Sequence, residues 1–461
     1  MKIGLLPLYI KLYDDVAQDI RPRLDAFYET VAKEFEARGI EVVRSAFCRL
    51  QPEFDAAVRS FENAEAEVIV TLHMAYSPSL ESIEALCDTN LPIVILDTTE
   101  TEEFTSMQDP GEIMYCHGIH GVMDMCSLLY RRGVPYAIAA GHWKNSDVID
   151  RVCGMARAAA AARALSKGKV GLIGESFAGM GDFRVSYNEL FERFGIKVEK
   201  VSGDDLRKLY DGITDEEISA EKADNAGKYD FDDGIVEEEY TASVRSCLAV
   251  RKYVQSADLT AFSINFTRIG YNDTGLTSMP FLECCKAMES GIGYAGEGDV
   301  MTAAFVGALL KSWPETTFVE IFCPDWKNNT LFLSHMGEVN YRISDVRPLV
   351  CRAQRNYVAA AMYPYAGYAK MQGGKGVYVN ISRAADDYHM FIASADMLSC
   401  EEDSFANAVR GWMKPENGTV AEFLEAHSRV GATHHSIFVY GATAEEMTCF
   451  ADQLGLDYTV L

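Results

Sequence analysis

Apolar residues follow two different spacings along the first two thirds of the chain. In places about four to eight apolar residues stand together, which is typical of a buried parallel strand. Elsewhere they recur every three or four positions, as at Phe27, Val31 and Phe35, which indicates a helix with one buried face. The first strands predicted in this way are Lys2–Pro7, Val42–Phe47, Ala66–Leu72, Pro92–Asp97 and Tyr136–Ala140. Helices are predicted at Asp25–Arg38, which Gly39 ends, and at Ser146–Ser166, with Ser146 as the N-cap.

The same alternation begins again at Lys169 and changes after about Trp313. Strands are predicted at the run KVGLIG from Lys169, at Ile196–Val201 and at Leu259–Asn265. The later strands, which have no long helices between them, are Thr317–Cys323, Thr330–Ser334, Gly376–Asn380 and His389–Ser394. Strands without crossover helices favour an antiparallel barrel or sandwich.

These patterns predict an α/β protein of three domains. Two tandem doubly wound, Rossmann-like domains are expected at 1–166 and 167–313, because each alternates strands with helices. A mainly antiparallel, β-rich domain is expected at 314–461. A chain of 461 residues is too long for one core, which agrees with several domains.

Charge and composition narrow the partners and the compartment. The formal net charge of −26 repels polyanions, so we expect no nucleic-acid partner. No apolar run approaches the roughly 20 residues of a membrane span, and the N-terminal run is too short for a signal peptide. The twelve cysteines include no CxxC pair. Free thiols without a secretion signal predict a cytoplasmic protein.

Several carboxylates and imidazoles lie at strand ends or between glycines. His335 ends a predicted strand, and His434 and His435 come just before another, Ile437–Tyr440. Glu297 is flanked by two glycines, and Glu320 interrupts an apolar strand. Two carboxylates and two imidazoles suit an octahedral divalent cation such as Mn²⁺, Co²⁺ or Mg²⁺. Taken one by one, each residue also has an ordinary structural explanation, and spacing alone does not join residues so far apart.

Six short segments, in the same order along the chain, resemble segments of the L-arabinose isomerase family. They are Leu72-His73 with Ser77-Pro78, Gly141-His142-Trp143, Gly293–Asp299 (GYAGEGD) with Thr302-Ala303-Ala304, Thr317–Glu320 (TFVE), Ser334–Val339 (SHMGEV) and His434–Phe438 (HHSIF). Each is moderately specific, and the span from the first segment to the last, residues 72 to 438, covers most of the chain. The resemblance implies a metal-dependent aldose–ketose isomerase.

The resemblance also implies roles for individual residues. Glu297, Glu320, His335 and one histidine of the 434–435 pair match the family's metal ligands. We expect His435 to be that ligand, with His434 as the alternative. The two glutamates would also be the catalytic acid and base. The expected metal is Mn²⁺, with Co²⁺ or Mg²⁺ as alternatives, and no organic cofactor is expected.

Four further positions correspond to substrate contacts in that family. Phe266 matches an aromatic residue of the sugar pocket. His120 matches a histidine that reaches a neighbouring subunit's active site, which predicts a homo-oligomer built from trimers with shared sites. Ile10 and His117 stand where the family has glutamines that contact the sugar. These two departures leave the reaction class in place and the identity of the sugar open.

The function predicted from the sequence is therefore isomerisation of a pentose or hexose through a cis-enediol. Two alternatives remain. A sugar epimerase on the same scaffold would use the same enediolate chemistry, and a non-catalytic sugar-binding protein would share the tandem α/β domains.

Overall fold

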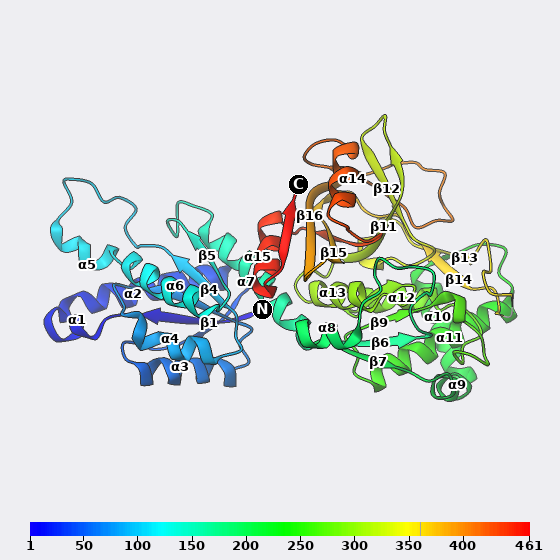
Figure 1. Ribbon diagram of the computed structural model, residues 1–461, viewed down its shortest axis with the longest axis horizontal. Coiled ribbons are helices and arrows are strands. Elements are labelled where there is room, and N and C mark those ends of the chain that lie inside the picture. The colour runs from blue at the N-terminus through cyan, green and yellow to red at the C-terminus, as the bar shows by residue number, and fades with distance from the viewer. Residues whose placement is uncertain (360) are drawn as a thin grey trace. The chain divides into compact units, whose positions relative to one another are not determined.

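The computed structural model describes residues 1–359 and 361–461, in which the chain divides into two units (Figure 1). Unit 1 comprises residues 1–163 and 449–455, and unit 2 comprises residues 164–448 and 456–461. No helix in the described residues is long and apolar enough to cross a membrane. The predicted fold class, two parallel α/β sheets followed by an antiparallel β region, is confirmed.

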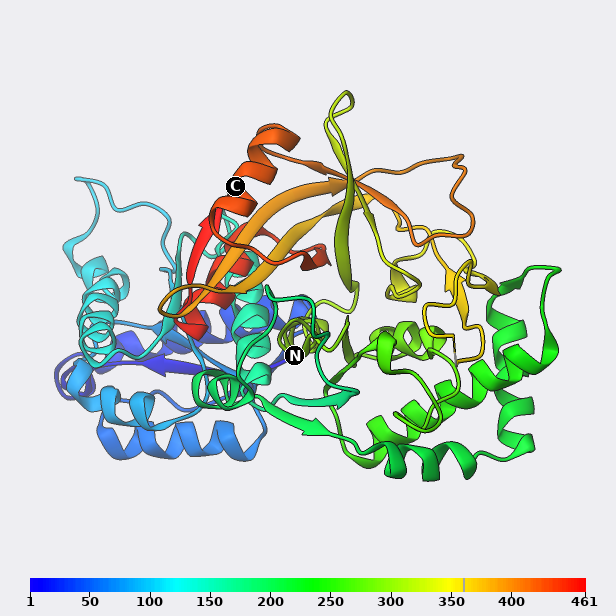
Figure 2. The same ribbon diagram turned by 45° about the vertical axis from the view of Figure 1, so that its right-hand side comes forward.

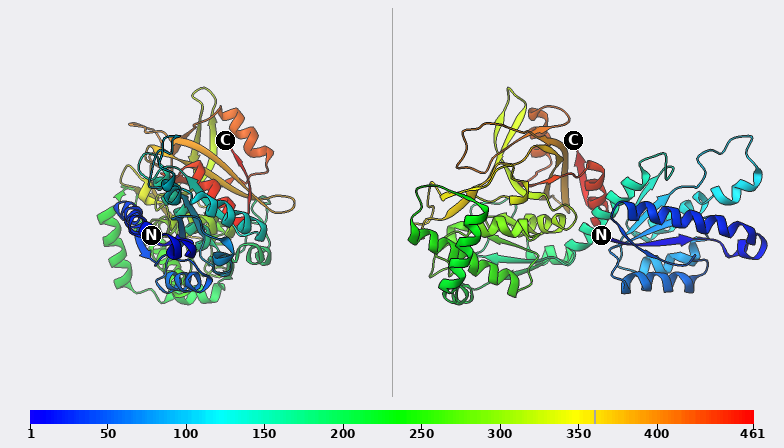
Figure 3. Two further views of the ribbon diagram at one scale, coloured as in Figure 1. Left: turned by 90° about the vertical axis from the view of Figure 1, so that its left-hand side faces the viewer. Right: turned by 180° about the vertical axis from the view of Figure 1, so that it is seen from behind.

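Unit 1 is built on a parallel sheet with the strand order β2-β1-β3-β4-β5. The strands are β1 (Lys2–Leu8), β2 (Glu41–Arg44), β3 (Val68–His73), β4 (Ile93–Asp97) and β5 (Tyr136–Ala140). All five were predicted, although β2 ends three residues before the expected Phe47. The helices are α1 (Lys11–Val16), α2 (Arg21–Ala37), α3 (Gln51–Asn63), α4 (Ser79–Asp88), α5 (Ile113–Cys116), α6 (Ile119–Arg132) and α7 (Val148–Leu165). Figure 3 shows β1 between α2 on one side and α3 with α4 on the other.

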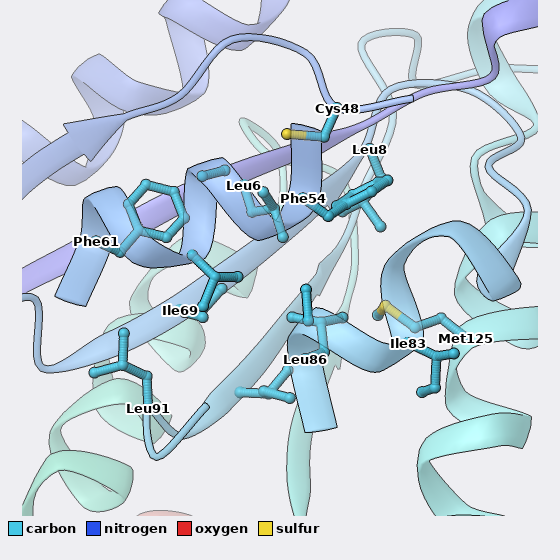
Figure 4. Packing of buried hydrophobic residues seen from close by; sticks show 14 of the residues in the cluster. Leu6, Leu8, Cys48, Phe54, Phe61, Ile69, Ile83, Leu86, Leu91 and Met125 are labelled. Carbon is cyan, nitrogen blue, oxygen red and sulfur yellow. The ribbon is translucent and has the colours of Figure 1, made fainter. Parts of the chain in front are cut away.

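One hydrophobic cluster of unit 1 lies where α3, α4 and α6 pack on the sheet (Figure 4). Helical spacing places Phe54, Val58 and Phe61 of α3 on one face, against Leu6 and other strand residues. Phe61 lies directly over Gly4, where an added Cβ would come within 2.4 Å of its ring. The glycine therefore allows this close approach of helix and strand.

Unit 2 begins with a parallel sheet in the order β10-β9-β6-β7. Its strands are β6 (Lys169–Ile173), β7 (Lys197–Lys200), β9 (Ala261–Ile264) and β10 (Gly293–Gly296). Its helices are α8 (Tyr187–Phe194), α9 (Gly203–Asp211), α10 (Asp215–Lys228), α11 (Glu237–Ser256), α12 (Phe281–Glu289) and α13 (Val300–Leu310). Every residue of α13 is buried, because this helix contacts β6, β9 and β10 of the parallel sheet and also β11 (Thr316–Asp325) and β18 (His435–Tyr440). It joins the two layers of unit 2.

The later strands of unit 2 close into an antiparallel ring. The hydrogen-bonded order β15-β18-β11-β12-β17-β16 returns to β15, and β19 (Asp457–Val460) adds to β16 in parallel. The remaining ring strands are β12 (Thr330–Ser334), β15 (Gly374–Arg383), β16 (Tyr388–Met397) and β17 (Gly411–Pro415). Figure 2 shows the long strands β15 and β16 curving side by side. A small sheet of β14 (Tyr365–Tyr368), β13 (Leu349–Arg352) and β8 (Asp230–Phe231) and the helices α14 (Val420–Arg429) and α15 (Ala444–Leu454) complete the fold.

Candidate metal centre

The antiparallel ring brings three of the predicted ligands together through its register. Glu320 of β11 lies directly opposite His435 of β18, and opposite Ser334 of β12 on its other side. His335 is the next residue after Ser334, where β12 ends. Glu320 in the middle of β11, His335 just after β12 and His435 at the start of β18 therefore meet, although they are far apart in the sequence.

Glu297 reaches the same place from the turn between β10 and α13. Its backbone has a positive φ of 64°, a conformation that residues other than glycine rarely adopt. The amide of Phe177 donates to the carbonyl of Glu297 at 2.8 Å, and the hydroxyl of Ser176 donates to the carbonyl of Gly298 at 2.8 Å. A Cβ at Gly296 would lie 3.0 Å from the His335 ring, so glycine leaves space for that imidazole.

We call Glu297, Glu320, His335 and His435 the Glu–His cluster. In it, Oε1 of Glu320 lies 3.0 Å from Nε2 of His335 and 3.1 Å from Nε2 of His435. The same Nε2 of His435 lies 3.5 Å from Oε2 of Glu297. The atoms that can bind a cation fall into two groups, one of Glu320, His335 and His435 and one of Glu297, His434 and His435, each spanning less than 4.8 Å. His435 belongs to both.

Several of these buried atoms approach one another without forming a hydrogen bond. Oε2 of Glu297, Oε1 of Glu320 and Nε2 of His435 have no hydrogen-bond partner in the described residues, although their separations are short. Buried polar groups without partners are costly to a fold. Lone pairs that converge in this way fit a divalent cation, which would satisfy all of them at once.

Two further carboxylates orient the imidazoles. Oδ2 of Asp299 lies 2.9 Å from Nδ1 of His435, and Oε2 of Glu338 lies 2.5 Å from Nδ1 of His335. The hydroxyl of Tyr294 donates to the other oxygen of Glu338 at 3.0 Å. A carboxylate at Nδ1 keeps the proton there and leaves the lone pair of Nε2 directed at the cluster. Neither carboxylate was predicted as a site residue, although both lie close to a predicted ligand in the sequence.

Charges inside the cluster shift the pKa values of its members strongly. Burial raises the pKa of Glu297, but the imidazoles of His434 and His435 outweigh it and bring the pKa to about 2. Burial likewise opposes ionisation of Glu320, and the histidines nonetheless lower its pKa. Burial lowers the pKa of His335, whereas Glu338 and Glu320 raise it to about 10. The carboxylates of the cluster therefore stabilise positive charge beside them. When no metal ion is bound, a proton on an imidazole supplies that charge.

The structure distinguishes the two histidines of the 434–435 pair. His435 is fully buried, and its ring stacks on Phe183 with centroids 4.7 Å apart. His434 is half-exposed, and its Nδ1 lies 2.6 Å from Oδ2 of Asp182. Its Nε2 is 3.6 Å from Oε2 of Glu297. Only His435 lies beside both glutamates, which favours it as the ligand.

A pocket of about 800 Å³ lies beside the cluster in unit 2. Its lining includes Glu297 and His335, together with the predicted sugar contact Phe266. Phe266 stacks on Phe177 with ring centroids 5.9 Å apart. A pocket with several aromatic walls and a few convergent polar groups is typical of a small-molecule site.

The other predicted sugar contacts belong to unit 1. Nε2 of His117 lies 2.9 Å from the hydroxyl of Tyr13, and the rings of His117 and His120 are 5.6 Å apart. His120 also lies edge-on to Tyr76. Ile10 directly precedes α1, the helix that carries Tyr13. Unit 1 therefore brings His117 and His120 together, in a polar and aromatic setting.

Comparison with known proteins places the chain in a family. The model of the L-arabinose isomerase central domain matches residues 188–312, and that of the L-arabinose isomerase C-terminal domain matches residues 315–457. Together they cover more than half of the chain. The chain belongs to the L-arabinose isomerase family. It is therefore an enzyme of the aldose–ketose isomerase class.

Individual members of the family align with most of the chain at low identity. The L-arabinose isomerase of Tolumonas auensis is 24% identical over 425 residues, covering 89% of this chain and 84% of its own. That of Shouchella clausii is 23% identical over 473 residues, covering 99% and 93%. Among solved structures, a solute-binding protein from Agrobacterium vitis bound with α-D-tagatopyranose covers 68% of this chain and 89% of its own, at 14% identity and a TM-score of 0.16. That likeness is too weak to bear on function.

Proposed function

We propose that this isomerase interconverts the aldose and ketose forms of a pentose or a hexose. In this proposal the reaction depends on a divalent cation held by Glu297, Glu320, His335 and His435. The observation that carries the proposal is the convergence of partnerless Oε and Nε atoms in the buried Glu–His cluster. Mixed oxygen and nitrogen ligands suit Mn²⁺, with Co²⁺ or Mg²⁺ as alternatives.

We propose that the two glutamates move the proton. Aldose–ketose conversion through a cis-enediol removes a proton at one of the carbons C1 and C2 and returns it at the other. The lowered pKa values of Glu297 and Glu320 keep both carboxylates ionised at neutral pH, so either can accept that proton. When bound, the cation supplies a positive charge that stabilises the enediolate. Glu338 and Asp299 hold the imidazoles in the tautomer that the ligand role requires.

The substrate would lie in the pocket beside the cluster. Phe266 offers an apolar face to the carbon side of a sugar, and the burial of His335 limits water near the reacting carbons. Substrate contacts are further proposed for His117, His120 and Ile10. We propose that the working form is a homo-oligomer built from trimers, in which His120 completes the site of a neighbouring subunit.

The test is a panel of pentoses and hexoses incubated with EDTA-treated protein and with Mn²⁺, Co²⁺ or Mg²⁺ added back in turn. Chromatography of the products separates the two enzymatic alternatives, because an isomerase converts aldose into ketose and an epimerase returns the same carbonyl class. Turnover should vanish after EDTA treatment and return with at least one cation. Undiminished turnover in the EDTA-treated protein would contradict the metal dependence.

A further inference from the structure

The pocket beside the Glu–His cluster is larger than a free pentose requires. Its volume is about 800 Å³, and pockets of about 300–1,000 Å³ suit ligands of drug size. Besides Glu297, His335 and Phe266, its lining includes residues 353–358, 361, 404, 405, 407 and 408. The pocket thus has room for a substituent beyond the reacting carbons.

One cation lines this pocket without a counter-ion. Arg355 is exposed, and it forms no ion pair with any carboxylate in the described residues. Nearby arginines behave differently: Arg352 binds both oxygens of Glu239 at 2.6 and 2.7 Å, and Arg410 pairs with Asp403 at 2.8 Å. In a chain with 68 acidic and 42 basic residues, a guanidinium without a carboxylate is available for an external anion.

The segment that carries Arg355 is tied to the pocket wall at both ends. The amide of Ala353 donates to the carbonyl of Pro364 at 2.9 Å, and that of Met362 donates to Thr277 at 2.7 Å. Between them, the ring of Tyr357 packs edge-on against Phe266 at 5.8 Å. These contacts fix the backbone on either side of Arg355 to the same wall that holds Phe266.

The remaining polar side chains on these segments are neutral. Gln354, Ser404 and Asn407 line the pocket and are exposed, so they offer hydrogen-bond donors without adding negative charge. Two carboxylates line the pocket. Glu297 belongs to the Glu–His cluster, and Glu338 is hydrogen-bonded to Tyr294 and His335. The pocket therefore combines an acidic, cation-binding part with a separate basic and neutral part.

We infer that the substrate is an aldose bearing an anionic group at the end remote from C1, and that Arg355 binds this group. A phosphate, a carboxylate and a sulfonate share the chemistry that a guanidinium recognises, which is a set of coplanar or clustered oxygens carrying negative charge. The sugar's C1 and C2 would then lie at the Glu–His cluster and its charged end at Arg355. This inference rests on the proposed function for the reacting end of the sugar.

The first experiment compares neutral and anionic forms of the same parent sugar. For glucose, galactose and mannose, kcat/KM is measured for the aldose, its uronate and its 6-phosphate, in the Mn²⁺-loaded protein at low ionic strength. We expect an anionic form to exceed its neutral parent by 10-fold or more in at least one series, and the better of the two anions identifies the group. Equal or better turnover of the neutral sugar in every series would overturn the inference.

Variants connect that preference to Arg355. Arg355→Met should reduce the ratio of anionic to neutral kcat/KM by 10-fold or more, Arg355→Lys should keep much of it, and the exposed Arg429→Met should leave it unchanged. An unchanged ratio in Arg355→Met would remove the assignment.

A binding measurement keeps this test separate from the isomerase activity. Glucitol, galactitol and mannitol and their 6-phosphates have no carbonyl to isomerise, so calorimetry with them reports recognition alone. Tighter binding of a phosphate form that is lost in Arg355→Met supports the anion site even if no sugar is turned over, a result that would contradict only the proposed function. Equal binding of both forms in all three pairs would contradict the anion site.

Discussion

Asp299 performs two tasks with its two carboxylate oxygens, and replacing it by asparagine should separate them. Oδ1 accepts from the amide of Thr302 at 2.9 Å and caps the N-terminus of α13, while Oδ2 lies 2.9 Å from Nδ1 of His435. The side chains of Asp299 and His435 are both completely buried. Asparagine has one oxygen and one NH₂ group, so it can accept only one of the two hydrogen bonds.

The cost to metal binding follows from this geometry. In the metal-loaded protein, Nδ1 of His435 must carry a proton so that Nε2 can bind the cation, and the amide oxygen must therefore turn towards His435. The helix cap is then lost, at about 1 kcal/mol. Replacing an ionised acceptor by a neutral one weakens the remaining hydrogen bond by about 1 kcal/mol more. The sum of about 2 kcal/mol corresponds to a loss of roughly 30-fold in Mn²⁺ affinity.

The assay is calorimetric titration of Mn²⁺ into the metal-free Asp299→Asn protein, with circular dichroism to verify folding. A matched control is Asp109→Asn, since Asp109 caps a helical turn of unit 1 by accepting from Gly111 at 2.7 Å. The control should bind Mn²⁺ like the unmodified protein. If Asp299→Asn also binds Mn²⁺ within about twofold of the unmodified protein and melts at the same temperature, then Asp299 does not hold His435 for a metal.

Three other predictions address the protons and the assembly. Glu320→Gln should lower kcat by roughly 10²–10⁴-fold, because an amide cannot accept the proton, while the affinity for Mn²⁺ falls only in part. The exposed Glu425→Gln is the control. If the Glu320→Gln variant retains its kcat, Glu320 is not the catalytic acid or base. The pKa of His335 is about 10, so below that pH a proton occupies the metal-free site and must leave when Mn²⁺ binds. The affinity for Mn²⁺, measured by calorimetry, should therefore rise between pH 6 and pH 8 by up to about 10-fold per pH unit for each proton displaced. An affinity that does not change with pH would contradict the role of His335 as a ligand. Light scattering should report a mass that is a multiple of the 51.1 kDa chain, and a monomer would refute shared sites. A mixture of inactive His120→Ala and inactive Glu297→Gln subunits should regain activity. If the mixture stays inactive after proven subunit exchange, the sites are not shared.

The sequence predicted the parallel sheets well because their strands are continuous apolar runs. The predicted strands Pro92–Asp97 and Tyr136–Ala140 match β4 and β5 almost residue for residue, since both are unbroken runs of apolar residues. It missed β10, whose sequence GYAG lacks the β-branched residues that mark strands. It also missed β19, a mostly exposed edge strand with no apolar run.

The arrangement of the candidate site was harder to predict than its members. Motif resemblance selected Glu320 and His435, but spacing along the chain carries no information that they face each other across two antiparallel strands. That pairing is set by the register of β11 against β18, two strands that are more than 100 positions apart in the sequence. Asp299 and Glu338 lie inside the same motifs, and their roles became visible only when the orientation of each imidazole was known.

The backbone of Glu297 has a strained conformation that its proposed role in the cluster explains. A glutamate with a φ of 64° costs on the order of 1 kcal/mol or more relative to glycine at the same position. Glycine would relieve that strain and leave α13 capped by Asp299, so stability alone does not explain a glutamate there. The turn is held by the hydrogen bond from Phe177 to the carbonyl of Glu297 and that from Ser176 to Gly298, both within unit 2. A strained conformation that is fixed from outside and aims a buried carboxylate at two histidines is what a preorganised ligand or base requires, because the cost of positioning is met during folding and not at each turnover.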